Sequence, residues 1–321
     1  FVLPAWIVEY FFLSGSQGEL LNNARGVTLL FASLAGLAMG IYCFTLPHTP
    51  PQKGASKMAL TEVLELLRDR AFLVLVIVGF GIAIVHKFFF VLNSPYLKAM
   101  LFRGGLAGWE GRMSSIGQVA AVGVMAALAL IILKVGFKAT MSLGIVAYIA
   151  RCVLLAAAAA IEGSFSTSMT LICIGQALHG FCFGCFLAAA FMYVDRTSPP
   201  DARGSMQNFF GTFILGLGFL AGGLVAGQVG KAFEAPSNAG VGMVGGATAW
   251  TGWQAQAGTP ENSLRASLGI ESSAGWTPIQ GQFTQQDWVG AWLASAAIGL
   301  VCLAVFVMFF PRGKADAAKD A

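Results

Sequence analysis

Long apolar runs constrain this chain more than any other feature of its sequence. Seven segments each supply the roughly 20 apolar residues that cross a bilayer as a helix. They lie near residues 27–46, 71–92, 113–133, 139–161, 168–194, 206–229 and 288–310. Only 11% of the residues are charged, against about a quarter in soluble domains. We therefore predict an all-α integral membrane protein.

A polar break, Leu46-Pro-His-Thr-Pro-Pro51, divides these spans into two groups. After it, residues 59–70 place apolar side chains at helical spacing against charged ones, which predicts an amphipathic helix on the membrane surface. Six spans follow, as in one half of a two-bundle transporter. The predicted domains are the last two helices of an N-terminal bundle, the first of them partial, a cytoplasmic linker, a C-terminal six-helix bundle and a cytoplasmic tail. They cover residues 1–46, 47–70, 71–314 and 315–321.

The chain begins at Phe1, without a Met, inside an apolar stretch at 1–14. On the two-bundle template we expect about eight of twelve helices here and about four upstream. Residues 230–287 are rich in Gly, Ser, Gln, Thr and Trp and lack long apolar periodicity, so we expect an extracytoplasmic insert. It would be a small folded cap, a set of aromatic anchors or a partly ordered surface segment.

The distribution of Lys and Arg predicts the orientation. Loops 47–70, 134–138 and 195–205 and the tail after Phe310 hold eleven of these cations, and the opposite loops hold six. Because positively charged loops resist translocation, we expect the C-terminus in the cytoplasm. The net charge of +4 follows from this bias, so it indicates no nucleic-acid partner.

The spans lack the motifs of the common catalytic and cofactor sites. There is no Walker A loop, no paired-His metal motif and no Gly-x-Ser-x-Gly elbow. The Cys182-x-x-Cys185 pair has neither a second ligand pair nor a soluble redox context, so we interpret both residues as packing. We expect no enzyme activity, catalytic residue, metal or cofactor.

Polar side chains inside apolar spans are the candidate functional residues, because they are costly in hydrocarbon without a cavity or a partner. His86, Phe90 and Asn93 share one face of the span 71–92, which would suit a polar ring-shaped ligand. Alternatively, His86 lies near the outer end of the span and reaches water. In the span 168–194, Gln176, His179 and Phe183 form one stripe, which favours a pocket over plain core packing.

Three side chains are candidates for carrying a proton. Histidine is the side chain that ordinarily exchanges a proton near neutral pH, which makes His86 and His179 candidates. Glu9 is the third, if burial raises its pKa. Glu9 would otherwise lie at the outer mouth of its span. We expect Arg151 to form an interhelical hydrogen bond instead of clamping a substrate.

Small residues in the span 206–229 predict close helix packing. Gly218 and Gly222 are four residues apart, as are Gly223 and Gly227. This spacing lets helix backbones approach each other in lipid.

Three stretches resemble the nucleoside:proton symporter family of the major facilitator superfamily, and the resemblance covers nearly the whole chain outside 230–287. The first two are Leu46-Pro-His-Thr-Pro50 and Ser142-Leu-Gly-Ile-Val-Ala-Tyr-Ile-Ala-Arg-Cys152. The third is His179-Gly-Phe-Cys-Phe183, continuing to Asp195-Arg-Thr-Ser-Pro-Pro-Asp-Ala-Arg-Gly-Ser-Met-Gln207. It is the most specific, because Pro200, Arg203 and Gln207 reproduce the family's entry into the eleventh span.

The resemblance implies a twelve-helix, two-bundle carrier that alternates access and imports a nucleoside or similar solute with a proton. Gln118 matches a polar position of the eighth span, and His179 and Phe183 match an aromatic pair in the tenth. Two positions depart from the pattern. Ala121 stands where the nucleoside carriers have a carboxylate, and His179 replaces the first aromatic residue of the pair.

We therefore predict a secondary active transporter in the inner or plasma membrane that imports nucleosides, or similar small polar ring-bearing solutes, by proton symport. The predicted substrate-binding residues are Gln118, His179, Phe183, His86, Asn93 and Gln176. The expected partners are the solute, protons and the lipid bilayer, and we expect a monomer. Two alternatives stay open: a major-facilitator carrier of sugars or drugs, and a non-transporting membrane sensor. A sugar site would favour Trp, and we expect none inside the visible bundle.

Overall fold

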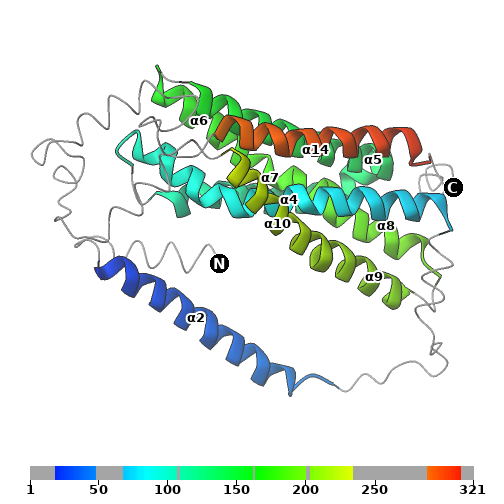
Figure 1. The fold of residues 1–321 in the computed structure, drawn as a ribbon. Coiled ribbons are helices and arrows are strands. Elements are labelled where there is room, and N and C mark those ends of the chain that lie inside the picture. Colours follow the sequence, from blue (N-terminus) through cyan, green and yellow to red (C-terminus); the bar gives the residue numbers. More distant parts are fainter. Residues whose placement is uncertain are drawn as a thin grey trace, which may run out of the picture. The chain divides into compact units, whose positions relative to one another are not determined.

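The computed structural model describes residues 19–47, 68–106, 109–161, 163–199, 203–233 and 288–311. Within these ranges the regular structure is helical, without a strand (Figure 1). Helix α2 (Glu19–Cys43) belongs to one compact unit, and the other described helices belong to a second. The stretch 1–14, most of the linker, nearly all of the insert 230–287 and the tail 315–321 lie outside the described residues.

Five long helices in the second unit are apolar enough to cross a membrane. They are α4 (Arg70–Phe102), α5 (Glu110–Ala160), the continuous run Phe165–Thr197, the run Arg203–Gly230 and α14 (Trp288–Phe309). Helix α5 is kinked at Gly136, where φ is 82°. Glycine adopts this backbone conformation without steric strain, whereas other residues do not. Helix α5 thus covers the predicted span 113–133 and nearly all of 139–161. The predicted all-α fold is confirmed.

Helix α4 runs ten residues beyond the predicted end of its span at residue 92. Asp69 begins it as an N-cap, since its side chain accepts hydrogen bonds from the backbone N–H groups of Ala71 and Phe72. Pro95 lies inside the helix without ending it. In the bundle, buried neighbours hold the helix past the proline, and the Tyr96 hydroxyl donates to the Leu155 carbonyl at 2.8 Å.

The run Phe165–Thr197 consists of α6 (Phe165–Ala177), α7 (His179–Phe181), the π-helix η1 (Cys182–Ala188) and α8 (Ala189–Thr197). The next run consists of α9 (Arg203–Gly211), the π-helix η2 (Thr212–Gly218) and α10 (Phe219–Ala232). Widened π turns of this kind are rare and frequently mark functional positions. The apolar pattern predicts the two spans 168–194 and 206–229 but not these π turns.

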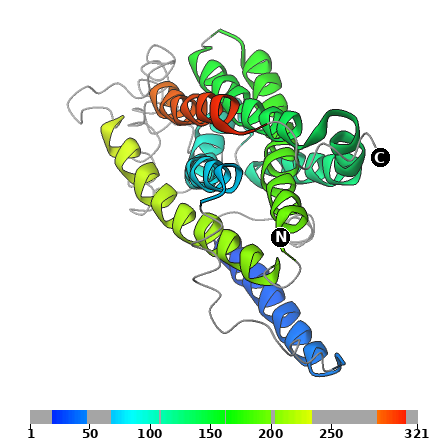
Figure 2. The same ribbon diagram turned by 90° about the vertical axis from the view of Figure 1, so that its right-hand side faces the viewer.

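Helix packing depends on glycines at close approaches. Helix α14 packs on α5 and α4, and α10 packs on α4 (Figure 1, Figure 2). A Cβ added at Gly218 or Gly222 would lie 2.7 Å from the Cβ of Ala83 or Lys87, respectively, so the predicted close contact at this glycine pair is confirmed. The pair Gly223 and Gly227 has no such neighbour within 4 Å among the described residues, so it makes no close contact there.

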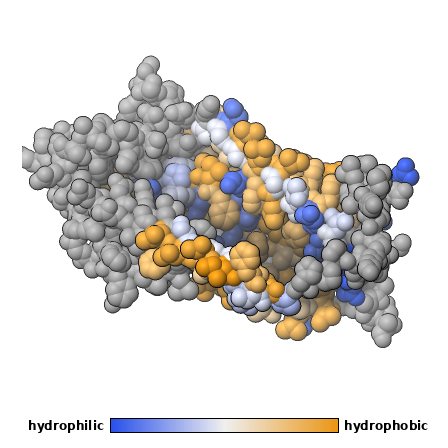
Figure 3. Space-filling model, turned by 90° about the horizontal axis from the view of Figure 1, so that it is seen from below, coloured by the Kyte–Doolittle hydropathy of each residue, from blue (hydrophilic) through white to orange (hydrophobic). Residues whose placement is uncertain are grey.

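Aromatic side chains fill the bundle interior. Trp288 and Trp292 on α14 are only 1% and 0% exposed, so the expectation of an interior without Trp is wrong. Both indoles pack edge-on against the ring of Tyr96. Much of the described surface in Figure 3 is hydrophobic, as expected for helices in contact with lipid.

Candidate functional site

Four aromatic rings from three helices form a continuous stack inside the bundle. The order is Phe89 on α4, His179 on α7, His86 on α4 and Phe219 on α10. Successive ring centroids are 5.8, 5.7 and 5.6 Å apart, with interplanar angles of 19°, 22° and 21°. The two histidines predicted from separate spans are therefore neighbours.

A cation lies over each end of this ring stack. The guanidinium carbon of Arg151 is 3.7 Å from the ring centroid of Phe89. At the other end, Nζ of Lys87 is 5.9 Å from the ring centroid of Phe219. The face of an aromatic ring carries partial negative charge, so both contacts are attractive.

Both histidines also have a hydrogen-bond partner on α5. Nδ1 of His86 lies 2.6 Å from the hydroxyl oxygen of Tyr148, and Nη1 of Arg151 donates to Nδ1 of His179 at 3.0 Å. All four side chains are buried, with at most 5% of their surface exposed. Arg151 thus forms the expected interhelical hydrogen bond. The interpretation that His86 simply reaches water is wrong, because His86 is only 4% exposed.

Arg151 keeps two further donors, Nε and Nη2, without a hydrogen-bond partner in the described part of the chain. Its side chain is 0% exposed. A buried guanidinium is costly unless a nearby group offsets its charge. Here the nearby groups are the Nδ1 atom of His179 and the rings of Phe89 and Tyr148.

A second polar group links α6, α4 and α5. Nε2 of Gln176 donates to Oδ1 of Asn93 at 2.7 Å, and Nδ2 of Asn93 donates to the hydroxyl of Ser114 at 3.4 Å. Asn93 and Gln176, which were predicted as site residues on different spans, therefore pair with each other. Both are buried, so this contact satisfies polar groups in an apolar interior.

Two phenylalanines connect the ring stack to the bundle surface. Phe90 lies 5.0 Å from His86, measured between ring centroids, and Phe183 in η1 lies 6.3 Å from it. Their side chains are 48% and 39% exposed. Each ring therefore contacts His86 and keeps part of its surface exposed.

Gln118 is the predicted site residue that stands apart. Its side chain is exposed, and it hydrogen-bonds to none of the other predicted site residues. The adjacent Gly117 does contact the site, since a Cβ there would lie 3.1 Å from Cβ of His179. Glu9 lies outside the described residues.

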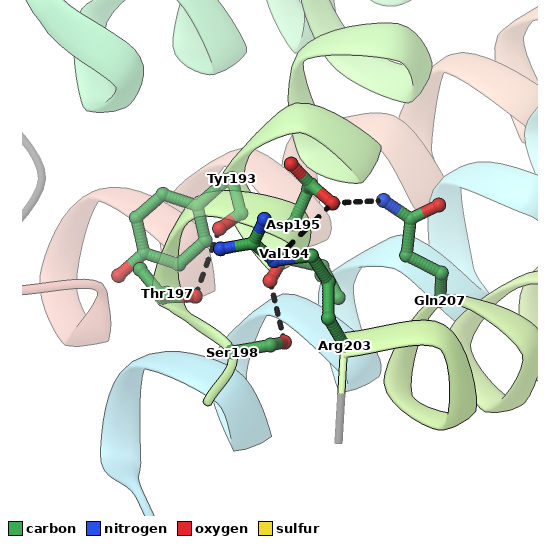
Figure 4. Close-up of polar contacts among 7 residues, drawn as sticks. All are labelled: Tyr193, Val194, Asp195, Thr197, Ser198, Arg203 and Gln207. Atoms are coloured by element: carbon green, nitrogen blue, oxygen red, sulfur yellow. Dashed lines mark hydrogen bonds and ion pairs between the residues drawn. The ribbon is translucent and has the colours of Figure 1, made fainter. Parts of the chain in front are cut away.

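A polar cluster that was not predicted from the sequence links α8 to α9. Nε2 of Gln207 donates to Oδ1 of Asp195 at 2.9 Å, and Nε of Arg203 lies 3.7 Å from the same oxygen (Figure 4). The side chain of Asp195 points across the turn toward both partners. The signal was present in the third resemblance stretch, where Asp195 stands twelve residues before Gln207 across a Pro-Pro turn.

A cavity of about 780 Å³ opens beside this cluster. Ile132 on α5, Phe191 and Asp195 on α8 and Gln207 on α9 contribute to its wall. It is mainly apolar with charged side chains at one end. The Arg203–Asp195 ion pair there is about half exposed, so it stabilises the turn by at most about 1 kcal/mol.

Comparison with known proteins identifies the relatives of this chain. A family model described as "Nucleoside H+ symporter" matches residues 1–254. The chain is 27% identical to the putative nucleoside transporter YegT of Escherichia coli. The match covers 67% of this chain and 51% of YegT. The chain is 23% identical to the nucleoside permease NupG of Escherichia coli, over 71% of this chain and 54% of that protein. The chain thus spans about half the length of these curated relatives.

Two crystal structures of the nucleoside transporter NupG, one of them of a mutant, resemble the fold. Their TM-scores are 0.59 and 0.66, at 18% identity, over 97% of this chain and 65% of theirs. The predicted major facilitator fold is therefore confirmed for the bundle described here. The family model covers more than half of the residues, so the chain belongs to the nucleoside H+ symporter family.

Proposed function

We propose that the full-length protein is a secondary active transporter that imports nucleosides by proton symport with alternating access. One observation carries the proposal. A chain of the nucleoside H+ symporter family stacks two buried histidines next to two half-exposed phenylalanines in one bundle. This arrangement combines a hydrogen-bonding group with an aromatic face, the two features that recognise a nucleobase.

In this proposal Phe183 stacks on the base, because its ring is partly open. His179 and His86 form hydrogen bonds with the edge of the base or with the ribose hydroxyls. Gln118, with its exposed amide, adds a hydrogen bond from α5. Asn93 and Gln176 form the polar wall deeper in the bundle, where they already satisfy each other.

The side chain that accepts the transported proton must keep its hydrogen-bond partner both before and after protonation. His86 meets this requirement among the described candidates, because the hydroxyl of Tyr148 both donates and accepts hydrogen bonds. Lys87 and Arg151 lie close to His86, so its protonated form needs an anion to offset the added charge. Glu9 is a further candidate for the proton carrier.

We also propose how the protein lies in the membrane. The protein lies in the inner or plasma membrane as a monomer, with its C-terminus in the cytoplasm. The excess of cations in the loops 47–70, 134–138 and 195–205 supports this orientation. The α8–α9 turn with Asp195 would then lie on the cytoplasmic side.

Uptake of labelled uridine and adenosine into cells that make the full-length protein tests the function. We expect accumulation that a protonophore abolishes and that unlabelled nucleosides, but not hexoses, compete away. Failure to accumulate any nucleoside would refute the substrate. Accumulation that ignores the protonophore would refute the coupling, and competition by hexoses would favour the sugar carrier.

A further inference from the structure

The contact between Arg151 and His179 assigns a chemical role to each residue. We propose that Arg151 is a positioning residue that fixes His179 as a neutral imidazole with its hydrogen on Nε2. His179 then offers a permanent hydrogen-bond donor to the ligand and does not carry the transported proton. The ligand part rests on the proposed function, whereas the tautomer part rests on the contacts alone.

The hydrogen bond determines which ring nitrogen of His179 carries hydrogen. Guanidinium groups have five N–H donors and no acceptor, and they stay protonated in proteins. Nη1 of Arg151 lies 3.0 Å from Nδ1 of His179, so Nδ1 is the acceptor and has no hydrogen. The single hydrogen of the neutral ring is then on Nε2. If Nδ1 of His179 also took up a proton, its N–H would point at the N–H of Arg151 Nη1, 3.0 Å away, and neither group could accept a hydrogen bond.

Packing holds both side chains in this geometry. The ring of His179 lies between Phe89 and His86, with centroids 5.8 and 5.7 Å away. The backbone of α5 approaches from the side, where a Cβ at Gly117 would come within 3.1 Å of Cβ of His179. Arg151 is 0% exposed, and its guanidinium carbon lies 3.7 Å from the ring centroid of Phe89. The imidazole therefore has little room to turn over and exchange its two nitrogens.

The other ring nitrogen of His179 is available to a ligand. In the described part of the chain, the fully buried side-chain nitrogens without a partner belong to Arg151, Trp288 and Trp292. Nε2 of His179 is not one of them, and it makes no hydrogen bond to the described residues. This nitrogen therefore keeps a donor for an acceptor atom of the ligand, such as a base carbonyl or ring nitrogen.

The charges around His179 also oppose a proton there. Arg151 faces it from α5, and His86 faces it from α4, with Tyr148 and Lys87 next beyond His86. The carboxylates of the described residues are those of Glu19, Asp69, Glu110 and Asp195. All four lie at or beside a helix end, so none of them offsets a second positive charge next to Arg151.

Solid-state NMR of full-length protein labelled with ¹⁵N-histidine, in lipid vesicles, tests the tautomer directly. His179→Gln assigns the signals, because the pair that disappears belongs to His179. We expect one protonated nitrogen, Nε2, and one unprotonated nitrogen, Nδ1, at every pH from about 5.5 to 8. A hydrogen on Nδ1, or a doubly protonated ring within this range, would overturn the proposal.

Variants of Arg151 test the positioning role. Arg151→Gln can turn either end of its amide toward Nδ1, so we expect His179 to lose its single tautomer and to titrate. We also expect nucleoside affinity in this variant to fall at least tenfold and to vary with pH between about 5 and 7. Arg151→Lys keeps a permanent donor and should restore both the tautomer and the affinity. A merely structural role for Arg151 would lower stability without creating the new titration.

The controls separate this inference from the proposed function. If the full-length protein binds no nucleoside but His179 shows the expected nitrogen signals, the ligand class fails and the tautomer stands. If nucleosides bind and Arg151→Gln leaves both the signals and their pH dependence unchanged, the positioning role fails. Circular dichroism and monodispersity of each variant identify any that have not folded, and Arg151→Lys then carries the comparison with the wild type.

Discussion

At the scale of single residues, the partner of each buried polar side chain decides what that side chain can do. Tyr148 gives His86 a partner that both donates and accepts, whereas Arg151 gives His179 one that only donates. Asn93 and Gln176 satisfy each other. The site therefore contains three different kinds of polar group, although all of them were predicted from the same signal, a polar residue in an apolar span.

The stacking role of Phe183 leads to the first prediction. Phe183→Ala should weaken nucleoside binding by roughly 5- to 150-fold, because stacking on an aromatic ring contributes about 1–3 kcal/mol per base. Phe181→Ala is the matched control, since this residue lies two positions earlier, is also partly exposed and has no ring contact with the site among the described residues. Titration calorimetry with the full-length protein measures both. Equal losses in the two variants would contradict a stacking role.

The Asn93–Gln176 pair leads to a prediction about stability. Gln176→Leu should destabilise the protein by about 1 kcal/mol, because Asn93 then keeps a buried amide without its partner. In the double variant Asn93→Leu/Gln176→Leu the loss should be smaller than the sum of the two single losses. Unfolding in a denaturing detergent gives the three free energies. Strict additivity would show that the two amides do not interact.

At the scale of helices, close backbone contacts hold the site together. A Cβ at Gly180 on α7 would lie 2.6 Å from the Ala120 carbonyl oxygen on α5, so α5 and α7 approach each other directly behind His179. Gly144 makes a similar approach to η1, 2.6 Å from the Phe186 nitrogen. These contacts fix the distance between the helices that carry Arg151 and His179.

Gly180→Ala should therefore lower the melting temperature of the full-length protein and weaken nucleoside binding, since backbone atoms cannot yield as a flexible side chain does. Gly123→Ala on α5 is its control. No described atom lies within 4 Å of a Cβ at Gly123, and alanine favours a helix by up to about 1 kcal/mol over glycine. Thermal unfolding curves of the two variants give the melting temperatures to compare. A melting temperature for Gly180→Ala equal to or above that of Gly123→Ala would be incompatible with this contact.

Hydropathy was sufficient to predict the spans, because a helix in lipid must cover its backbone with apolar side chains over a fixed length. It failed at Pro95, which the bundle accommodates, and at η1 and η2, where one extra residue per turn leaves composition unchanged. Helical spacing placed His86 with Asn93 on one face, and Gln176 with His179 on another. It did not pair His86 with His179 or Asn93 with Gln176, because periodicity within a helix carries no information on its neighbours. The exposed position of Gln118 was missed for the same reason.

At the scale of the whole molecule, the chain covers only 51% of YegT and 54% of NupG. Its relatives are about twice as long as the stretch matched here. Alternating access requires a second bundle that moves against this one around the site.

The orientation of the molecule gives one more prediction. A fluorescent protein fused after Ala321 should fluoresce in bacterial cells, because it folds in the cytoplasm but not after export. Alkaline phosphatase fused at the same position should stay inactive, since it needs the oxidising outer compartment. An active phosphatase with a dark fluorescent protein would reverse the predicted topology.

Proton movement driven by a nucleoside gradient is the direct measure of proton symport. The measurement uses purified full-length protein in liposomes that contain a pH-sensitive dye, with uridine added outside and no initial pH gradient. We expect that uridine acidifies the lumen and that the His179→Gln variant still couples uridine entry to proton entry, whereas liposomes without protein show no change. Uridine entry without any acidification would contradict proton symport.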